Sequence, residues 1–263
     1  MKNYLDAAGV TPLRNRLVCA FWELACAWRN FYCPLCEKGF DRMDPFTGYY
    51  RVRGVLVDHY TENAVCPSCG AKIRHRMMAQ FLIRRTDLLT SAKRVLHFAP
   101  EVQVAVFLKG LRNITYTACY SDTARYPGVL KIDLPEIALP DASYNAITCS
   151  HVLEHIRDDT RALAEMFRIL TPWGWAVIAI PVYGDTTFED PSLDFAGREK
   201  MYGVGSHQRM NGLDFRHKLA AAGFAVEVHS YDTVPGNYVD RGVRSQHMDS
   251  DRYLFFCTKP RGR

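Results

Sequence analysis

Two close pairs of cysteines are the most specific chemical signal in the sequence. Cys33 and Cys36 form one Cys-Pro-x-Cys knuckle, and Cys66 and Cys69 form a second one after 29 further residues. Each knuckle brings two thiolates close enough to share an ion, and four soft anionic sulfurs favour zinc in a closed tetrahedral site. The doubled spacing therefore predicts one structural zinc ion with no open position for catalysis.

The segment around the knuckles supports a metal site. Residues 31–70 are rich in Cys, Gly, Pro and Tyr and poor in core residues, so a bound metal would supply the free energy that a small core lacks. An alternating stretch at residues 49–57 predicts a small hairpin there. His59 and His75 are substitute ligands for a cysteine that does not bind. Four unrelated thiols, or a redox pair, are the alternative interpretation.

The elements after residue 92 alternate between strand and helix. Such alternation predicts an α/β fold with a mostly parallel sheet covered by helices on both faces. Strands are expected at residues 94–98, 114–119, 144–149, 175–182, 225–229 and 253–258, and helices at 102–110, 158–170 and 213–222. Because open parallel sheets bind ligands at the carboxyl ends of their strands, polar residues at those ends are candidates for a site.

Three stretches of this region resemble the class I S-adenosylmethionine-dependent methyltransferases. They are Val95–Glu101 (VLHFAPE), Ser150–His155 (SHVLEH) and Glu165–Trp175 (EMFRILTPWGW). The resemblance covers about residues 92–260 and implies a Rossmann-like fold, S-adenosylmethionine as cofactor and methyl transfer as the activity. With the two knuckles, Thr187–Asp190 and Ser206–Arg209, the chain is similar more narrowly to a bacterial group of zinc-knuckle methyltransferases.

The first turn of this region departs from the family pattern. The family has an acidic residue followed by two glycines at alternate positions, whereas this chain has His97, Ala99 and Glu101. Ala99 is the smallest replacement for a glycine, and Glu101 is suited to accept hydrogen bonds from the amino group of the methionine moiety. A carboxylate here suits a zwitterion better than a pyrophosphate, which argues against NAD. The alternative is a degenerate fold that binds no cofactor.

The resemblance implies further cofactor contacts. Asp122 stands where the family has an acidic residue for the ribose hydroxyls, with a solvated loop aspartate as the alternative. Asp133 and Leu134 resemble the pair that reads the adenine amino group and packs its ring, with a turn aspartate as the alternative. Ser150 and His151 follow the strand at residues 144–149, where the sulfonium and its methyl group are expected.

Residues 181–211 form a polar stretch without an apparent apolar face, which is typical of a lid or a substrate wall. Closure of this lid is expected to bring His207 toward the acceptor. His207 is the candidate general base because the ordinary pKa of histidine lies near neutrality. Asp185 and His151 are further catalytic candidates, and His155 is interpreted as structural.

The composition is that of an ordinary globular protein, with 263 residues, 48% hydrophobic and 23% charged. We expect an N-terminal helix at residues 12–30 within a zinc-knuckle segment at 1–90, and a methyltransferase domain at 91–263. The zinc segment is expected to cover or extend the substrate entrance. Nine cysteines, an odd number, suit reduced thiols and a cytoplasmic protein. No stretch has the roughly 20 apolar residues of a membrane span.

The net charge bears on the methyl acceptor. Lys+Arg 33 against Asp+Glu 28 gives +5, a mild excess. We therefore expect a small polar metabolite or a sugar, methylated on oxygen or nitrogen in natural-product or polysaccharide biosynthesis. The first alternative is an RNA methyltransferase, and the second is an inactive zinc-dependent binding protein. The RNA alternative relies on basic residues of the zinc segment, namely Arg51, Arg53, Lys72, Arg74, Arg76, Arg84 and Arg85.

Overall fold

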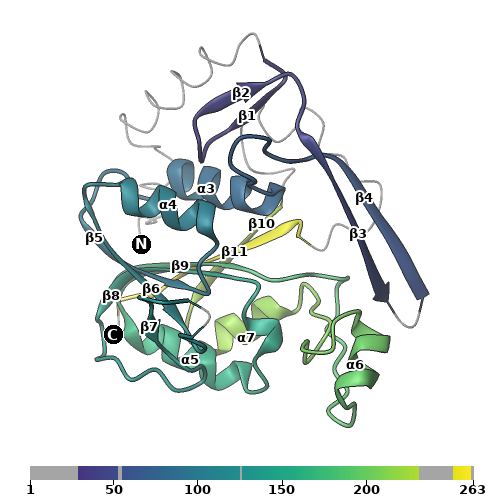
Figure 1. The fold of residues 1–263 in the computed structure, drawn as a ribbon. Helices are drawn as coiled ribbons and strands as arrows, with labels where there is room; N and C mark the ends of the chain where they lie inside the picture. The colour runs from purple at the N-terminus through teal and green to yellow at the C-terminus, as the bar shows by residue number, and fades with distance from the viewer. Residues whose placement is uncertain (1–28, 53–54, 125, 231–250, 262–263) are drawn as a thin grey trace.

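The computed structural model describes residues 29–52, 55–124, 126–230 and 251–261, so the helix expected at 12–30 lies outside the described residues. Within them, seven strands form one sheet in the order β10-β11-β9-β8-β5-β6-β7 (Figure 1). The first five in chain order are parallel, and β11 runs antiparallel to both of its neighbours. The bounds are β5 Lys93–Phe98, β6 Ile114–Tyr120, β7 Leu130–Lys131, β8 Tyr144–Ser150, β9 Leu170–Ala179, β10 Ala225–Ser230 and β11 Tyr253–Thr258.

Helices cover both faces of this sheet, which confirms the predicted fold class. Helices α3 (Ile73–Arg85) and α4 (Val102–Gly110) lie on one face, while α5 (Asp159–Ile169) and α7 (Phe215–Ala221) lie on the other (Figure 1). The α5 sequence shows why. Its apolar residues recur at helical spacing on one buried side, and Asp158 caps its first turn by accepting a hydrogen bond from the backbone of Arg161 at 3.0 Å. The buried residues are Ala162, Leu163, Met166 and Ile169.

The strand order reverses at β5, which lies between β6 and β8. The chain leaves β5 for α4 on one face, and it leaves β8 through the short helix η1 (Leu153–His155) for α5 on the other. The connections therefore diverge at the carboxyl ends of β5 and β8, and ligands of open parallel sheets bind in the crevice at such a point. The residues that follow these two strands are the ones that the fold places around a ligand.

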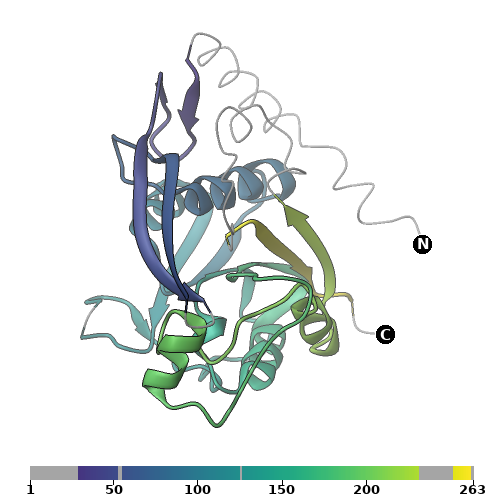
Figure 2. The ribbon, with the colours of Figure 1, turned by 90° about the vertical axis from the view of Figure 1, so that its right-hand side faces the viewer.

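The N-terminal part forms two hairpins outside the main sheet. Strands β1 (Phe31–Cys33) and β2 (Lys38–Phe40) pair with each other, and β3 (Asp44–Val52) pairs with β4 (Val55–Val65). The hairpin expected at residues 49–57 is thus confirmed as the end of a longer ribbon. This ribbon reaches helix α6 (Phe195–Tyr202), which contacts β3 (Figure 2).

Helix α3 precedes the boundary expected at residue 90, yet it packs with the main sheet. Its Met77, Phe81 and Leu82 share one apolar cluster with Leu108 of α4 and Val177 of β9. Among the described helices, none combines the length and apolar character needed to cross a bilayer.

Candidate functional site

The turn after β5 keeps a glycine-like backbone although it contains no glycine. Ala99 has a φ of +45°, in the left-handed region that usually requires glycine. Its N–H donates to the carbonyl of Cys119 on β6 at 2.9 Å, which fixes the turn to the sheet. Glu101 follows as the residue before the first turn of α4. The missing glycines of the family pattern therefore do not abolish the turn.

Glu101 is held by a buried histidine. His97 is fully buried, with Nδ1 3.1 Å from the Tyr116 hydroxyl and Nε2 3.0 Å from Glu101 Oε2. Burial by itself would raise the pKa of Glu101, but hydrogen bonds from His97 and Ser150 outweigh it and lower the pKa to about 2. A carboxylate thus stands at the carboxyl edge of the sheet, between the ends of β5 and β8. Sequence reasoning missed Tyr116, because a partner on a neighbouring strand leaves no local signal.

The residues after β8 form the opposite side of the crevice. His151 also has a left-handed backbone, with a φ of +54°, and its N–H donates to the carbonyl of Ala179 at 2.9 Å. Its Nε2 lies 3.1 Å from Asp251 Oδ1, and its Nδ1 lies 3.4 Å from Glu154 Oε1. Burial disfavours a charged imidazole, but the Asp251 carboxylate outweighs it and raises the pKa of His151. Asp251 lies 100 residues further along the chain, so sequence reasoning missed it.

Beyond His151, an acid and two histidines meet. Glu154 is fully buried, and neither of its carboxylate oxygens makes a hydrogen bond within the described chain. Burial raises the pKa of Glu154 to about 7. The rings of His155 and His207 lie 4.8 Å apart, edge to face, and burial lowers the pKa of His207 to about 4. Sequence reasoning left Glu154 unassigned; the signal was an acid beside a histidine directly after a strand end.

Residues 181–211 are more firmly packed than the sequence suggests. The expectation that this stretch lacks a core face is wrong, because it contains α6 and buries Tyr202 and Met210. Arg209, 1% exposed, donates to both oxygens of Glu189 at 2.8 and 3.0 Å. It also donates to the carbonyls of Ile156 and Arg157, at 2.8 and 2.9 Å, and so fixes the stretch to the end of η1. His207 therefore lies beside His155 without a closing motion.

The remaining predicted polar residues are three aspartates with exposed side chains. Asp122 is exposed, and its side chain accepts a hydrogen bond from the backbone of Ala124 at 3.1 Å within its own loop. Asp133 is exposed at the rim of a cavity of about 700 Å³, whereas Leu134 is buried in the core. Asp185 is exposed, and its carbonyl accepts from the backbone of Asp214 at 3.0 Å. The structure thus groups His97, Glu101, Ser150, His151 and His207 at the crevice, and leaves the three aspartates in surface loops.

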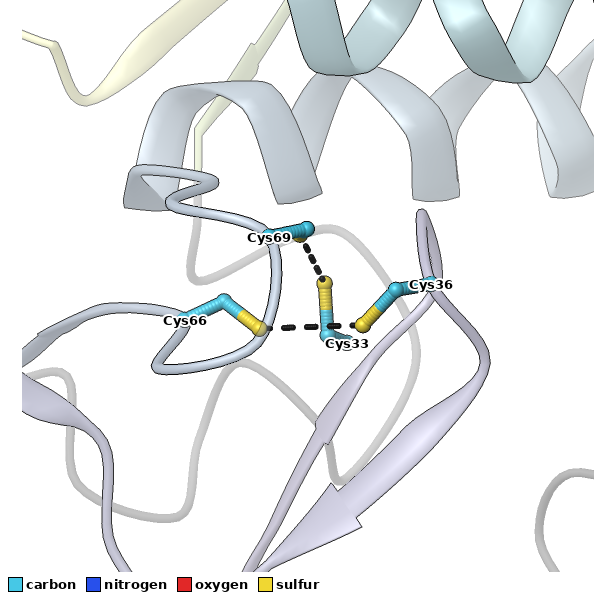
Figure 3. Close-up of side chains that lie close together, drawn as sticks. All are labelled: Cys33, Cys36, Cys66 and Cys69. Atoms are coloured by element: carbon cyan, nitrogen blue, oxygen red, sulfur yellow. Dashed lines mark hydrogen bonds between the residues drawn. The ribbon is translucent and has the colours of Figure 1, made fainter.

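The four knuckle cysteines face one another (Figure 3). Cys33 Sγ lies 3.6 Å from Cys69 Sγ, and Cys36 Sγ lies 3.7 Å from Cys66 Sγ. Bond lengths of about 2.3 Å to a tetrahedral zinc ion place sulfurs about 3.8 Å apart, so the thiols fit that ion. The close approach of the thiols raises the pKa of Cys33 and lowers that of Cys66.

The cysteine cluster is joined to the helices of the main sheet. The Gln103 side chain of α4 donates to the carbonyl of Cys69 at 3.0 Å. Arg76 of α3, which is buried, donates to the carbonyls of Ala64 and Ala71 at 2.9 and 2.8 Å. The cluster therefore anchors the start of α3 and lies close to the helix that Glu101 precedes.

Comparisons with known proteins agree with this geometry. A family model described as a methyltransferase domain matches residues 71–229. A probable S-adenosylmethionine-dependent methyltransferase of Mycolicibacterium smegmatis is 32% identical over 106 residues, which are 40% of this chain and 38% of that protein. The demethylmenaquinone methyltransferase of Deinococcus radiodurans is 44% identical over 46 residues, 18% of this chain and 19% of that protein. The chain thus matches less than two fifths of the length of either relative.

A solved structure shares the fold. The S-adenosylmethionine-dependent methyltransferase of Archaeoglobus fulgidus superposes with a TM-score of 0.50 at 14% sequence identity, covering 70% of this chain and 94% of that one. The match of the family model extends over more than half of this chain and includes the strands that form the crevice. The resemblance seen in the sequence is confirmed, and the chain belongs to the class I S-adenosylmethionine-dependent methyltransferases.

Proposed function

We propose that this methyltransferase transfers its methyl group to an oxygen or nitrogen atom of a small polar metabolite or a sugar, in natural-product or polysaccharide biosynthesis. The observation that carries the proposal is a group of polar side chains near the turn that follows β5. That turn contains Ala99 and Glu101. His151, Glu154, His155 and His207 follow one another around the end of β8. An acceptor hydroxyl or amine that approaches there meets imidazoles able to orient it and to take part in its loss of a proton.

On the cofactor side, Glu101 receives the amino group of the methionine moiety. Its carboxylate is ionised at neutral pH and already positioned by His97 and Ser150. Asp133 reads the adenine, Leu134 packs near its ring, and Asp122 meets the ribose hydroxyls; the exposed side chains of the two aspartates are accessible to a ligand. Methyl transfer is an in-line displacement, so alignment of donor and acceptor supplies much of the rate.

On the acceptor side, His207 is the residue whose loss should matter most. It is 6% exposed, and its Nδ1 makes no hydrogen bond within the described residues. That nitrogen lone pair is therefore free to bind a proton or a cation. His151 is held between Asp251 and Glu154 and positions the acceptor. Asp185 is exposed and serves at the outer rim.

Two basic residues of the RNA alternative are engaged within the protein. Arg76 is buried and donates to backbone carbonyls, and Arg74 Nη1 lies 3.3 Å from Asp251 Oδ2. These two guanidinium groups are not free to bind phosphates, which favours a small acceptor over a nucleic acid.

We further propose that the four cysteines hold one structural zinc ion. The sulfur separations of 3.6 and 3.7 Å support it, as does the soft, anionic character of four thiolates. The ion would join the β1–β2 turn to the turn between β4 and α3 and leave no coordination position open. It would have no part in methyl transfer.

The test is methyl transfer from labelled S-adenosylmethionine to a panel of sugars, nucleotide sugars and hydroxylated metabolites, with structured RNA in parallel. We expect label in a small molecule. We also expect His207→Ala to reduce turnover about 100-fold or more with nearly unchanged cofactor affinity, because the residue acts on the acceptor. His217→Ala, an exposed histidine on α7, is the matched control. Label in RNA, with steeply salt-dependent binding, would contradict the proposal.

A further inference from the structure

Glu154, His155 and His207 have the composition and spacing of a metal site. Their potential donor atoms all lie within 4.8 Å of one another. Two come from η1 and one from the stretch after α6, and the backbone N–H of Gln208 joins these segments by donating to the carbonyl of Glu154 at 2.8 Å. A first-row divalent ion with bonds of about 2.1 Å holds its donors about 3–4 Å apart. Small side-chain rotations would therefore close the three groups around one ion.

The polar atoms of this group lack hydrogen bonds. Glu154 is fully buried, and within the described chain both of its carboxylate oxygens are without a hydrogen bond. Two imidazole nitrogens lie near its Oε1, His151 Nδ1 at 3.4 Å and His155 Nε2 at 4.0 Å. His207 Nδ1 is also buried and makes no hydrogen bond within the described residues. A buried carboxyl group and a buried imidazole that make no hydrogen bonds lower the stability of the fold, unless another group binds them. One cation could bind both.

The surroundings hold these side chains in place. A ring N–H of His155 donates to the carbonyl of Ser206, which is the kind of contact that orients metal-binding histidines in proteins. Arg209, two residues beyond His207, ties the same stretch to the carbonyls of Ile156 and Arg157. The two segments that supply the donor atoms are thus fixed to each other from both sides.

We propose that Glu154, His155 and His207 bind one divalent first-row transition metal ion, which holds an oxygen of the methyl acceptor. Two imidazoles favour such an ion over magnesium or calcium, and three protein ligands leave positions open for a substrate. Because His151 joins this group to Ser150, whose side chain bonds to Glu101, an acceptor held by the ion would lie near the residues proposed for the methyl donor. The site itself is independent of the proposed function, whereas its role rests on that function.

The site gives the acceptor a route to lose its proton. A hydroxyl bound to such an ion has a lowered pKa, and its proton passes to solvent water. The acceptor oxygen then forms a bond to the methyl carbon as the bond from that carbon to sulfur breaks, and the electron pair stays on the sulfur of S-adenosylhomocysteine. His207 acts here as a ligand and not as the base.

The experiment is a cobalt titration of full-length protein supplied with one equivalent of zinc, which the four thiolates take up first. We expect one Co²⁺ per chain, with visible d–d absorption and without a thiolate charge-transfer band. Glu154→Gln and His207→Ala should each weaken Co²⁺ binding about 10-fold or more. Loss of a residue that only supports a metal ligand already lowers metal affinity about 10- to 100-fold. His217→Ala, the exposed histidine on α7, should leave it unchanged.

Two results would overturn the inference. One is the absence of Co²⁺ binding beyond the zinc-filled cysteine cluster, and the other is equal binding by wild type and both variants. Calorimetry with S-adenosylmethionine checks that each variant is folded, and His207→Ala decides alone if Glu154→Gln does not fold. Methyl transfer that proceeds at full rate without the second ion would refute its role on the acceptor. His207 would then be the base, and the proposed function would stand.

Discussion

Ala99 shows how one residue can replace a glycine and keep the backbone of the turn. Its φ of +45° is unfavourable for any residue with a Cβ, and the hydrogen bond to Cys119 holds it there. His151, at +54°, does the same at the end of β8. Strained residues thus occupy both strand ends that border the crevice, which is where such strain is commonly found in proteins.

Ala99→Gly should stabilise the protein. The left-handed backbone costs an L-residue roughly 1–2 kcal/mol, and part of the gain is offset because glycine loses more entropy on folding. We expect a net gain of about 0.5–1 kcal/mol in the free energy of unfolding, measured by urea denaturation. Ala105→Gly within helix α4 is the control and should be destabilising by about 1 kcal/mol. Equal losses in both variants would show that Ala99 is not strained.

Glu101→Gln should weaken cofactor binding. The variant keeps the shape of the side chain but loses the charge that we propose binds the amino group of the cofactor. Hydrogen bonds to charged groups are worth about 1.5–3 kcal/mol, so affinity should fall about 10- to 100-fold in calorimetry with S-adenosylmethionine. Glu62→Gln, exposed on β4, is the control. An unchanged affinity would remove Glu101 from the cofactor site.

Glu101 should also give the stability a specific pH dependence. Its folded-state pKa of about 2 lies below its ordinary value, so its contribution is fully present above about pH 4.5 and is lost as the pH falls toward 2. The shift corresponds to a contribution on the order of 3 kcal/mol. The difference in unfolding free energy between wild type and Glu101→Gln should therefore shrink between about pH 4.5 and about pH 2. A constant difference would contradict the assigned pKa.

At the scale of elements, apolar patterns predicted the strands and helices that pack in the core. Strand β8 and helix α5 were expected nearly at their observed bounds, because their buried residues recur at strand and helix periods. Strand β7, two residues long and exposed, has no such pattern. Helix α6 was missed because only Tyr202 is buried among its residues, while Phe195 is 60% exposed. Arg209 was missed as an anchor because a charged residue is expected at the surface.

Arg209→Met should loosen the stretch that positions His207. The change keeps much of the side-chain volume but leaves Glu189 and three backbone carbonyls without this donor. Breaking a buried ion pair by removing one partner typically costs about 3–5 kcal/mol. We expect a loss of this size in urea denaturation and faster amide exchange at residues 185–214. Arg216→Met, exposed on α7, should have neither effect; a neutral Arg209→Met would mean that the stretch is anchored elsewhere.

At the scale of the whole molecule, the N-terminal hairpins and the methyltransferase sheet meet along α3. The cysteine cluster contacts this helix and α4 at one end, and the β3–β4 ribbon reaches α6 at the other (Figure 2). The sequence predicted both parts and a zinc segment at the substrate entrance, but not which residues join them. The contacts between them join residues far apart in the chain, such as Cys69 with Gln103, and no local pattern encodes such pairs.

If the four cysteines hold the zinc ion proposed above, its loss should therefore unfold the N-terminal part first. Structural zinc contributes about 10–16 kcal/mol in zinc-finger peptides, while a whole domain is stable by about 5–15 kcal/mol. Few apolar side chains pack around the cysteines, whereas the sheet has large clusters on both faces. Cys66→Ser should lower the zinc content by one ion per chain and expose residues 29–70 to protease.

The sheet of that variant should remain folded but melt at a lower temperature, because α3 loses its anchors at Ala64 and Ala71. Cys119→Ala removes a buried thiol outside the cluster. This variant should keep the zinc ion, and its N-terminal part should remain resistant to protease. A Cys66→Ser protein that resists protease and unfolds in one transition at the wild-type temperature would show that the cysteines contribute packing alone. The hairpins would then be held by their contacts with α3 and α4, and the metal would not be needed for their fold.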